Sequence, residues 1–148
     1  MKKILLIGTG GTIASKQMGG GLTPGMEAQE ILEYVPEMAK ICEMDVLQLC
    51  NIDSTNMEPE VWTKLVLAIK ENYDKYEGFV VLHGTDTMAY TSAALSYMVQ
   101  NSRKPIVITG AQQPIDTDGT DAKVNLRDSI IYACDDYSEM WFWYLTAM

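Results

Sequence analysis

Two threonine-bearing turns are the segments of this chain whose residue types could do chemistry. One follows the apolar run 4–7 and places Thr12 after a pair of glycines. The other follows the apolar run 79–82 and contains Thr85 next to Asp86. A threonine hydroxyl becomes a nucleophile when a base activates it, and a nearby carboxylate can hold a cationic group of a substrate. The two turns therefore predict an active site built on threonine chemistry.

Small residues and a third polar segment add to this candidate site. Gly10 and Gly11 would let the backbone pass close to a ligand and aim N–H groups at a developing oxyanion. Asp53 and Ser54 follow a third apolar segment, 44–50, and could grip an α-amino or α-carboxylate group. Each of these residues taken alone is more often a turn or cap residue. Their shared position at strand ends favours a site for a small zwitterion such as an amino acid.

Continuous apolar runs that alternate with helical patterns must position these residues. Such runs are typical of strands buried on both faces of a parallel sheet. Parallel sheets bind their ligands at the carboxyl ends of the strands, so we expect the polar turns to face one crevice. The expected strands cover residues 3–8, 44–50, 79–82 and 105–108. The expected helices cover residues 27–40, a segment opening at 58–60, 88–100 and 121–135.

The connections carry further expectations. Residues 9–26 should form a long glycine-rich loop, either a lid over the crevice or a merely variable connection. Thr87 is expected to cap the helix at 88–100. In the helix at 121–135, Val124 and Leu126 are expected to face inward, together with Ile130 and Ala133.

Composition excludes several classes of protein. The chain has 148 residues, enough for about one domain, and a formal charge of -9, which argues against a nucleic-acid partner. The apolar runs are too short for a signal peptide or a membrane span. Three cysteines without CxxC spacing and a single histidine disfavour a zinc site and favour a reduced, cytoplasmic location.

Nucleotide binding is an alternative for the first turn, which spans residues 8–12. A dinucleotide fingerprint needs a third glycine and an immediate helix, but Ile13 stands in that glycine position. The Gly-Lys-Ser/Thr element of a phosphate-binding loop is absent as well. The residues therefore disfavour nucleotides.

Six collinear motifs resemble signatures of the bacterial-type L-asparaginases, especially the cytoplasmic type I branch. They lie at residues 9–15, 51–57, 83–88, 109–114, 118–119 and 125–126. The resemblance covers residues 1 to about 136. It implies an α/β fold, a flavodoxin-like parallel sheet flanked by helices, which corresponds to the N-terminal domain of the asparaginase fold.

The resemblance also implies an activity and roles for residues. The family hydrolyses asparagine to aspartate and ammonia, often with some glutaminase activity. Thr12 resembles the nucleophile that forms a β-aspartyl acyl-enzyme. Thr85 resembles the second catalytic threonine, which positions water or assists proton transfer. Asp86 resembles the residue that binds the substrate amino group, and Ser54 the residue that binds its carboxylate.

Other positions contribute to the expected substrate site. Asp53 would lie beside Ser54, and Gly11 and Gly84 belong to the signature turns. Ala111 resembles a residue whose backbone carbonyl meets the side-chain amide of the substrate. The family needs no metal and no organic cofactor, and its full-length members are expected to be homo-oligomers. The expected partners are therefore small molecules, L-asparagine or L-glutamine, with no nucleic acid and no membrane.

The sequence departs from the family pattern in two places. Many relatives carry a tyrosine in the flexible loop, where this chain has residues 20–24 without one. The catalytic lysine of the family lies on a segment that this chain does not reach, and Lys123 does not match it. The smaller C-terminal domain, which closes active sites across a dimer, is expected to be missing. We therefore expect a truncated chain with weak or no activity alone.

The expected organisation is an asparaginase N-terminal domain at 1–136 and an atypical aromatic tail at 137–148, which would be a fifth sheet member if it forms a strand. The tail suggests an early stop after a frameshift, and the alternative is a genuine short form. The alternatives for function are a non-catalytic domain that binds aspartate or asparagine, or an inactive gene fragment. An amidotransferase subunit shares the motifs but begins with an extra domain, which a signature strand starting at residues 1–3 disfavours.

Overall fold

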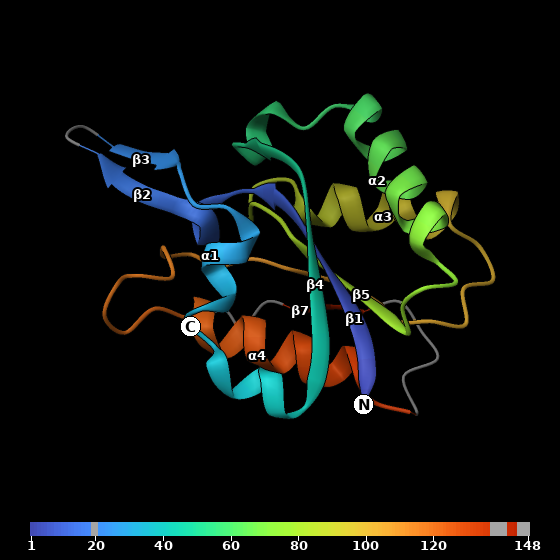
Figure 1. The fold of residues 1–148 in the computed structure, drawn as a ribbon. Coiled ribbons are helices and arrows are strands. Elements are labelled where there is room, and N and C mark those ends of the chain that lie inside the picture. Colours follow the sequence, from blue (N-terminus) through green and yellow to red (C-terminus); the bar gives the residue numbers. More distant parts are fainter. Residues whose placement is uncertain (19–20, 137–141, 145–148) are drawn as a thin grey trace.

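A computed structural model describes residues 1–18, 21–136 and 142–144, which form a parallel sheet between two layers of helices (Figure 1). In the described residues the sheet has five strands in the order β4-β1-β5-β6-β7. These are β1 Lys2–Gly10, β4 Cys42–Ile52, β5 Gly78–Leu82, β6 Ile106–Thr109 and β7 Phe142–Tyr144. The helices are α1 Ala28–Leu32, α2 Pro59–Asn72, α3 Met88–Met98 and α4 Ala122–Ala133.

The order of the strands is that of a flavodoxin-like fold. Counted along the chain, the main-sheet strands lie in the order 2-1-3-4-5, and every neighbouring pair is parallel. The direction of winding reverses between β1 and β5, where such folds bind ligands beyond the carboxyl ends of the strands. The expected α/β fold is confirmed.

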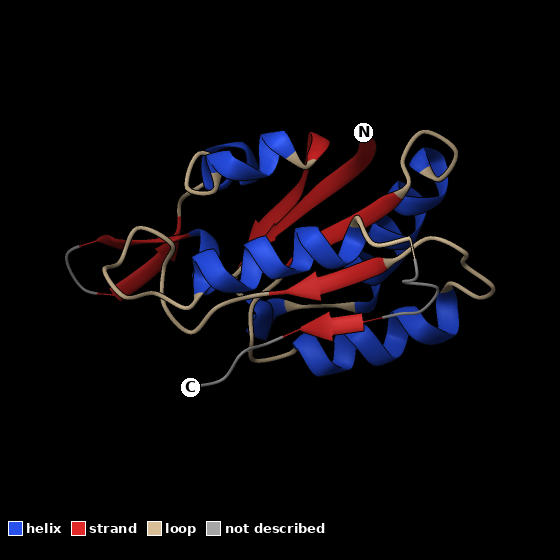
Figure 2. Ribbon diagram, turned by 90° about the horizontal axis from the view of Figure 1, so that it is seen from below, coloured by secondary structure: helices blue, strands red, loops and turns tan. Residues whose placement is uncertain are grey.

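Alternate side chains of β1 enter two separate hydrophobic cores. Ile4 and Leu6 pack with α1 and α4 on one face of the sheet. Leu5 and Ile7 pack with α2 and α3 on the other face. Figure 2 shows the strands running between these helical layers. Because β1 is buried on both faces, its sequence is a continuous apolar run rather than an alternating one.

The expected helix at 27–40 is wrong as a single element. Its first part is α1, and its last part is a 3-10 helix, Pro36–Lys40. Proline lacks an N–H and disfavours helical backbone in the residue before it. Val35 accordingly has φ -132° and ψ 54°, outside the helical region, so the α-helix cannot continue through it.

The expected loop at 9–26 contains regular structure. It holds a 3-10 helix, Thr12–Ala14, and an antiparallel hairpin of β2 Ser15–Met18 and β3 Gly21–Pro24. Lys16 Nζ bonds to Glu30 Oε2 at 3.0 Å, which ties this hairpin to α1. The expectation of a loop throughout residues 9–26 is therefore wrong, because the strands flanking the glycines pair with each other, and the choice between a lid and a variable connection stays open.

One expectation for a side chain is wrong, and another is confirmed only for the position of the residue. Val124 is 41% exposed, whereas Leu126 in the same helix is buried. Thr87 stands at the N-cap of α3 but makes no capping hydrogen bond with its side chain. Its hydroxyl instead donates to the carbonyl of Ser54 at 2.8 Å, so its side chain joins two turns and does not cap the first N–H groups of α3.

Part of the tail, β7, is a strand, and it is the fifth member of the sheet, as expected for a strand there. β7 pairs in parallel with β6 at the edge of the sheet. Residues 137–141 and 145–148 lie outside the described part of the chain. The division into a domain at 1–136 and a separate tail stays a prediction.

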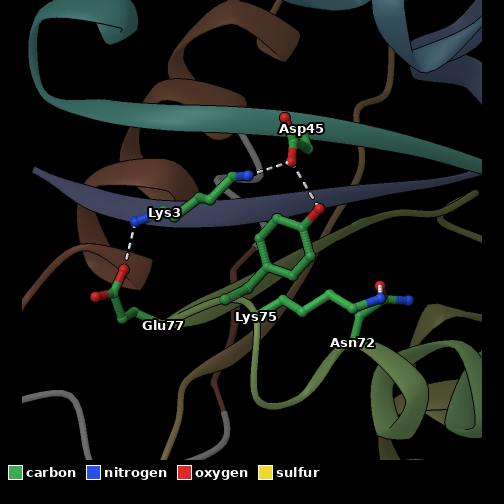
Figure 3. Close-up of polar contacts among 6 residues, drawn as sticks. Lys3, Asp45, Asn72, Lys75 and Glu77 are labelled. Atoms are coloured by element: carbon green, nitrogen blue, oxygen red, sulfur yellow. Dashed lines mark hydrogen bonds and ion pairs between the residues drawn. The ribbon is translucent and has the colours of Figure 1, made fainter.

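A polar cluster closes the amino end of the sheet (Figure 3). Lys3 Nζ lies 2.7 Å from Asp45 Oδ2, and the Tyr76 hydroxyl donates to the same carboxylate at 2.7 Å. The backbone N–H of Lys3 also donates to Glu77. The hydrogen bond from Lys3 lowers the pKa of Asp45, and the bond to Asp45 raises the pKa of Lys3. Three neighbouring strand starts are thus joined by groups that satisfy one another.

Two further observations concern sulfur and the membrane. The cysteines at 42, 50 and 134 are all free thiols. In the ranges that the structure describes, we find no helix with the length and apolar content needed to cross a bilayer.

Candidate active site

The carboxyl ends of β1, β4 and β5 meet at glycines where a side chain could not fit. Gly11 has φ +85°, and a Cβ on it would lie 2.4 Å from the Cα of Gly84. A Cβ on Gly84 would lie 2.5 Å from the hydroxyl oxygen of Ser54. The turns that carry the predicted residues are therefore packed backbone against backbone.

Hydrogen bonds hold these turns in register. The Gly11 N–H donates to the carbonyl of Ile52 at 3.0 Å, joining the ends of β1 and β4. The Thr9 hydroxyl donates to the carbonyl of Leu82 at 2.7 Å, joining β1 to β5. Together with the bond from Thr87 to Ser54, these contacts bring residues from distant parts of the chain to one place.

The result is a small pocket of about 160 Å³ at the point where the winding of the sheet reverses. It is lined by Gly11, Thr12, Ser15, Asp53, Ser54, Gly84, Thr85 and Asp86. Seven of these were singled out from the sequence, and the structure brings them together. The eighth candidate, Ala111, is fully buried and is not among the lining residues, so its expected role stays a prediction.

Several polar groups of the pocket have no hydrogen-bond partner among the described residues. Within the described residues, the hydroxyls of Thr12 and Thr85 and the carboxylate of Asp86 make no hydrogen bond. The backbone N–H groups of Thr12 and Thr85 also have no partner there. Such groups are available to a ligand, which supplies the bonds that the protein does not.

Asp53 differs from Asp86 because it has a structural task. Its Oδ1 accepts from both the N–H and the hydroxyl of Thr55, each at 2.9 Å. These two bonds lower the pKa of the Asp53 carboxyl. Asp53 thus caps the 3-10 helix Ser54–Asn56 and fixes the turn on which Ser54 stands.

Two polar residues of this region had no role in the sequence analysis. Ser15 lines the pocket, and its hydroxyl donates to the carbonyl of Gly11 at 3.0 Å. His83 is buried directly before the second turn and bonds to the carbonyl of Gly84 at 2.7 Å. The signal for His83 was present, since it is the chain's single histidine and ends a buried apolar run.

Known proteins share both the sequence and the fold of this region. The family model described as "Asparaginase, N-terminal" matches residues 3–141. The chain is 43% identical over 135 residues to an L-asparaginase of Thermococcus kodakarensis, covering 88% of this chain and 40% of that enzyme. It is 41% identical over 134 residues to a Glutamyl-tRNA(Gln) amidotransferase subunit of Metallosphaera sedula, covering 88% of this chain and 30% of that protein.

Solved structures give the same result. The thermostable L-asparaginase from Thermococcus kodakarensis superimposes with a TM-score of 0.79 at 40% identity, over 88% of this chain and 40% of that one. The probable cytoplasmic L-asparaginase from Campylobacter jejuni superimposes with a TM-score of 0.84 at 29% identity, over 94% of this chain and 42% of that one. The chain thus spans less than half the length of these relatives.

Proposed function

This chain belongs to the asparaginase family through its N-terminal domain, and we propose that it acts on the side-chain amide of L-asparagine, releasing aspartate and ammonia. The observation that carries the proposal is the pocket that gathers the hydroxyls of Thr12 and Thr85, the hydroxyl of Ser54 and the carboxylate of Asp86. Two hydroxyls suited to acyl transfer and two groups suited to a zwitterion match an amino-acid amide as substrate.

Thr12 is the proposed nucleophile. Its oxygen attacks the amide carbon, ammonia leaves, and the resulting β-aspartyl ester is hydrolysed by water. Thr85 positions that water or assists in proton transfer. The negative charge that develops on the amide oxygen needs N–H donors, and the unpaired N–H groups of Thr12 and Thr85 are the candidates among the described residues.

The hydrogen bond of Ser15 supports this use of the Thr12 N–H. All described peptide bonds are trans, so the Gly11 carbonyl and the Thr12 N–H point in opposite directions. Ser15 and the N–H of Ala14 both hold the Gly11 carbonyl, at 3.0 and 3.1 Å. The Thr12 N–H is therefore turned away from these two donors and kept in one orientation.

Substrate recognition falls to the acidic and hydroxyl groups of the other turns. Asp86 is exposed and unpaired within the described residues, so its carboxylate can bind the α-ammonium group. The hydroxyl of Ser54, which lines the pocket from a buried residue, can donate to the α-carboxylate. Asp53 supports Ser54 through its capping bonds.

The pocket also predicts slow turnover. Among the described residues that line it, none carries a basic side chain. A threonine hydroxyl needs a base, and general acid–base catalysis contributes about 10²–10⁴-fold to rates. We therefore propose that the 148-residue chain binds asparagine but hydrolyses it slowly.

An ammonia-release assay with asparagine and glutamine tests the proposal. The purified chain should release ammonia slowly, and Thr12→Ala should remove this activity while leaving the thermal unfolding temperature unchanged. Thr12→Ser is the matched control, because it keeps a hydroxyl at the same place. A Thr12→Ala protein that is as active as the unaltered chain would exclude Thr12 as the nucleophile.

Binding without catalysis is the second candidate function, and the absence of a basic group in the described pocket lining favours it. Calorimetry with aspartate separates the two. Saturable binding by a chain that releases no ammonia supports a binding domain, whereas measurable turnover dependent on Thr12 supports an enzyme.

An ammonia-supplying subunit is the third candidate. The identity to the Metallosphaera sedula amidotransferase protein, 41%, is nearly the same as the 43% identity to the Thermococcus kodakarensis enzyme, so sequence identity does not separate them. Activity that appears only when an amidotransferase partner is added would favour this third function.

Two further proposals concern location and assembly, the first from a relative and the second from the family resemblance. A cytoplasmic location is supported by the Campylobacter jejuni relative, which is described as probable cytoplasmic. A homo-oligomer is proposed for a full-length protein of this family. Cell fractionation and light scattering test them.

A further inference from the structure

The single histidine of the chain lies buried at the base of the candidate active site. His83 follows the last residue of β5 and precedes the turn that carries Thr85. Its Nδ1 lies 2.7 Å from the carbonyl oxygen of Gly84, and its Nε2 lies 2.8 Å from the hydroxyl of Thr91 in α3. The indole N–H of Trp62 in α2 donates to the same hydroxyl at 2.9 Å.

These contacts allow one assignment of protons. A carbonyl oxygen only accepts hydrogen bonds, so the proton of the imidazole must lie on Nδ1. Burial lowers the pKa of His83, so the ring is neutral and Nε2 is an acceptor. The Thr91 hydroxyl therefore donates to Nε2 and accepts from Trp62. The bonds run in one direction from α2 through α3 to the end of β5.

The orientation of the Gly84 carbonyl decides the orientation of the next N–H. The peptide bond is trans, so the Thr85 N–H points away from the buried imidazole that holds the carbonyl. This N–H has no partner among the described residues, and Thr85 lines the pocket. Glycine has the freest backbone of all residues, so an unheld Gly84 carbonyl could rotate.

We propose that His83 is a positioning residue: its Nδ1–H holds the Gly84 carbonyl and thereby aims the Thr85 N–H into the pocket, while Thr91 and Trp62 select the required tautomer. The consequence for catalysis rests on the function proposed above. The tautomer and the orientation of the peptide do not, and they can be measured without a substrate.

Two substitutions separate this positioning role from a role in packing alone, because the two roles predict opposite orders of activity for His83→Asn and His83→Gln. In His83→Asn, the amide nitrogen takes the place of Nδ1 and can still donate to Gly84, but Thr91 loses its acceptor. In His83→Gln, the amide oxygen reaches the place of Nε2 and can still accept from Thr91, but Gly84 loses its donor. Glutamine fills the buried space better, so packing alone favours His83→Gln.

The first experiment is nitrogen-15 NMR of the histidine ring in the full chain. With one histidine, the ring signals are unambiguous. We expect a neutral ring with the proton on Nδ1, and slower hydrogen exchange than in Thr91→Val, which removes the donor to Nε2. A proton on Nε2 in the unaltered chain would overturn the proposal, because Nδ1 could then not hold the Gly84 carbonyl.

The second experiment compares the two histidine variants. The oxyanion donors of other enzymes are worth about 10²–10³-fold in kcat, so we expect His83→Gln to lower the hydrolysis rate by about 10-fold to 100-fold at similar KM. His83→Asn should restore most of that rate, although it unfolds at a lower temperature. Equal rates for the two variants, or a slower His83→Asn, would refute the proposal.

A third readout keeps the result independent of activity. The amide signal of Thr85 should shift in His83→Gln and stay close to its original position in His83→Asn. If the unaltered chain neither binds aspartate nor releases ammonia, the proposed function fails while the tautomer and this amide signal still decide the role of His83. An unmoved Thr85 signal in His83→Gln would count against it.

Discussion

At the amino end of the sheet, Lys3, Asp45 and Tyr76 are bonded to one another, whereas at the carboxyl end the hydroxyls of Thr12 and Thr85 have no partner among the described residues. Both ends carry polar side chains on the same strands. Groups that satisfy each other contribute to stability and leave nothing for a ligand. Groups left unpaired contribute little to folding, and their hydrogen-bonding capacity is available for function.

The difference extends to the backbone. At the carboxyl end the turns are held by buried bonds from Thr9, Ser15 and His83 and by a partly buried bond from Thr87, all of which go to backbone carbonyls. At the amino end the polar bonds lie near the surface, where they are weak. The sheet therefore fixes the shape of its carboxyl end strongly, while the hydroxyls and the carboxylate of the candidate site there make no hydrogen bond among the described residues.

The largest effect is expected from adding a side chain where the turns of Gly11 and Gly84 touch. Gly11→Ala places a methyl group 2.4 Å from Gly84 at a positive φ, so we expect a loss of stability on the order of 3 kcal/mol or more. Ligand binding should be lost as well. Urea unfolding and aspartate calorimetry measure the two effects.

Gly119→Ala is the control for that substitution. Gly119 also has a positive φ, +75°, but a Cβ on it meets nothing within 4 Å. It should lose only about 1 kcal/mol, from backbone strain alone. Equal losses for the two variants would mean that the close approach of the turns is not what matters.

The next effect concerns the unpaired carboxylate at the carboxyl end. Asp86→Asn should weaken aspartate binding about 10-fold to 100-fold, since hydrogen bonds to charged groups are worth about 1.5–3 kcal/mol. Stability should not change, because no described residue bonds to this carboxylate. Asp74→Asn, which makes the same charge change in the turn that precedes β5, should bind normally. A matching loss in both variants would indicate a general charge effect.

A smaller effect is expected from the bond between two turns. Thr87→Val keeps the shape of the side chain but removes the donor to the Ser54 carbonyl. We expect about 1 kcal/mol less stability and a several-fold weaker affinity for aspartate. Thr55→Val provides the comparison, because it removes the hydroxyl bond from Thr55 to Asp53 at the start of the 3-10 helix that contains Ser54. If Thr55→Val weakens binding more, the bond of Thr87 is not the main support of Ser54.

The smallest effect is expected on stability at the amino end of the sheet, where the contribution of the Lys3–Asp45 pair depends on pH. The folded pKa of Asp45 is lowered by Lys3, so the stability from this pair is present above the ordinary aspartate pKa of 3.8. It is lost as the pH falls through the folded pKa. The raised pKa of Lys3 means that its share persists below 10.5 and is lost as the pH rises through the folded pKa.

Asp45→Asn tests this expectation. The variant should unfold at a slightly lower urea concentration than the unaltered chain at pH 7, and this difference should become smaller at pH 3 and below, as the Asp45 carboxyl of the unaltered chain gains its proton. Ligand binding should be unaffected at both values. A change in binding as large as that of Asp86→Asn would contradict the separation of the two ends.

Much of the fold was predictable from the sequence because parallel strands buried on both faces leave continuous apolar runs. The strands expected at 3–8 and 79–82 were recognised in this way, and they lie inside β1 and β5, respectively. The helix at 27–40 was not predictable as it stands, because local apolar spacing outweighed the break at Pro36. Val124 was assigned inward for the same reason, although the spacing of a helix does not say how wide its buried face is.

The parallel α/β class, the family resemblance and seven of the eight residues that line the pocket could be read from the residue types beside the apolar runs. The contacts of Ser15, His83 and Thr87 became apparent only in the folded chain. Their bonds go to backbone carbonyls of neighbouring turns, and carbonyls look alike in every sequence. Which of them a hydroxyl or an imidazole meets depends on how strands distant along the chain pack side by side.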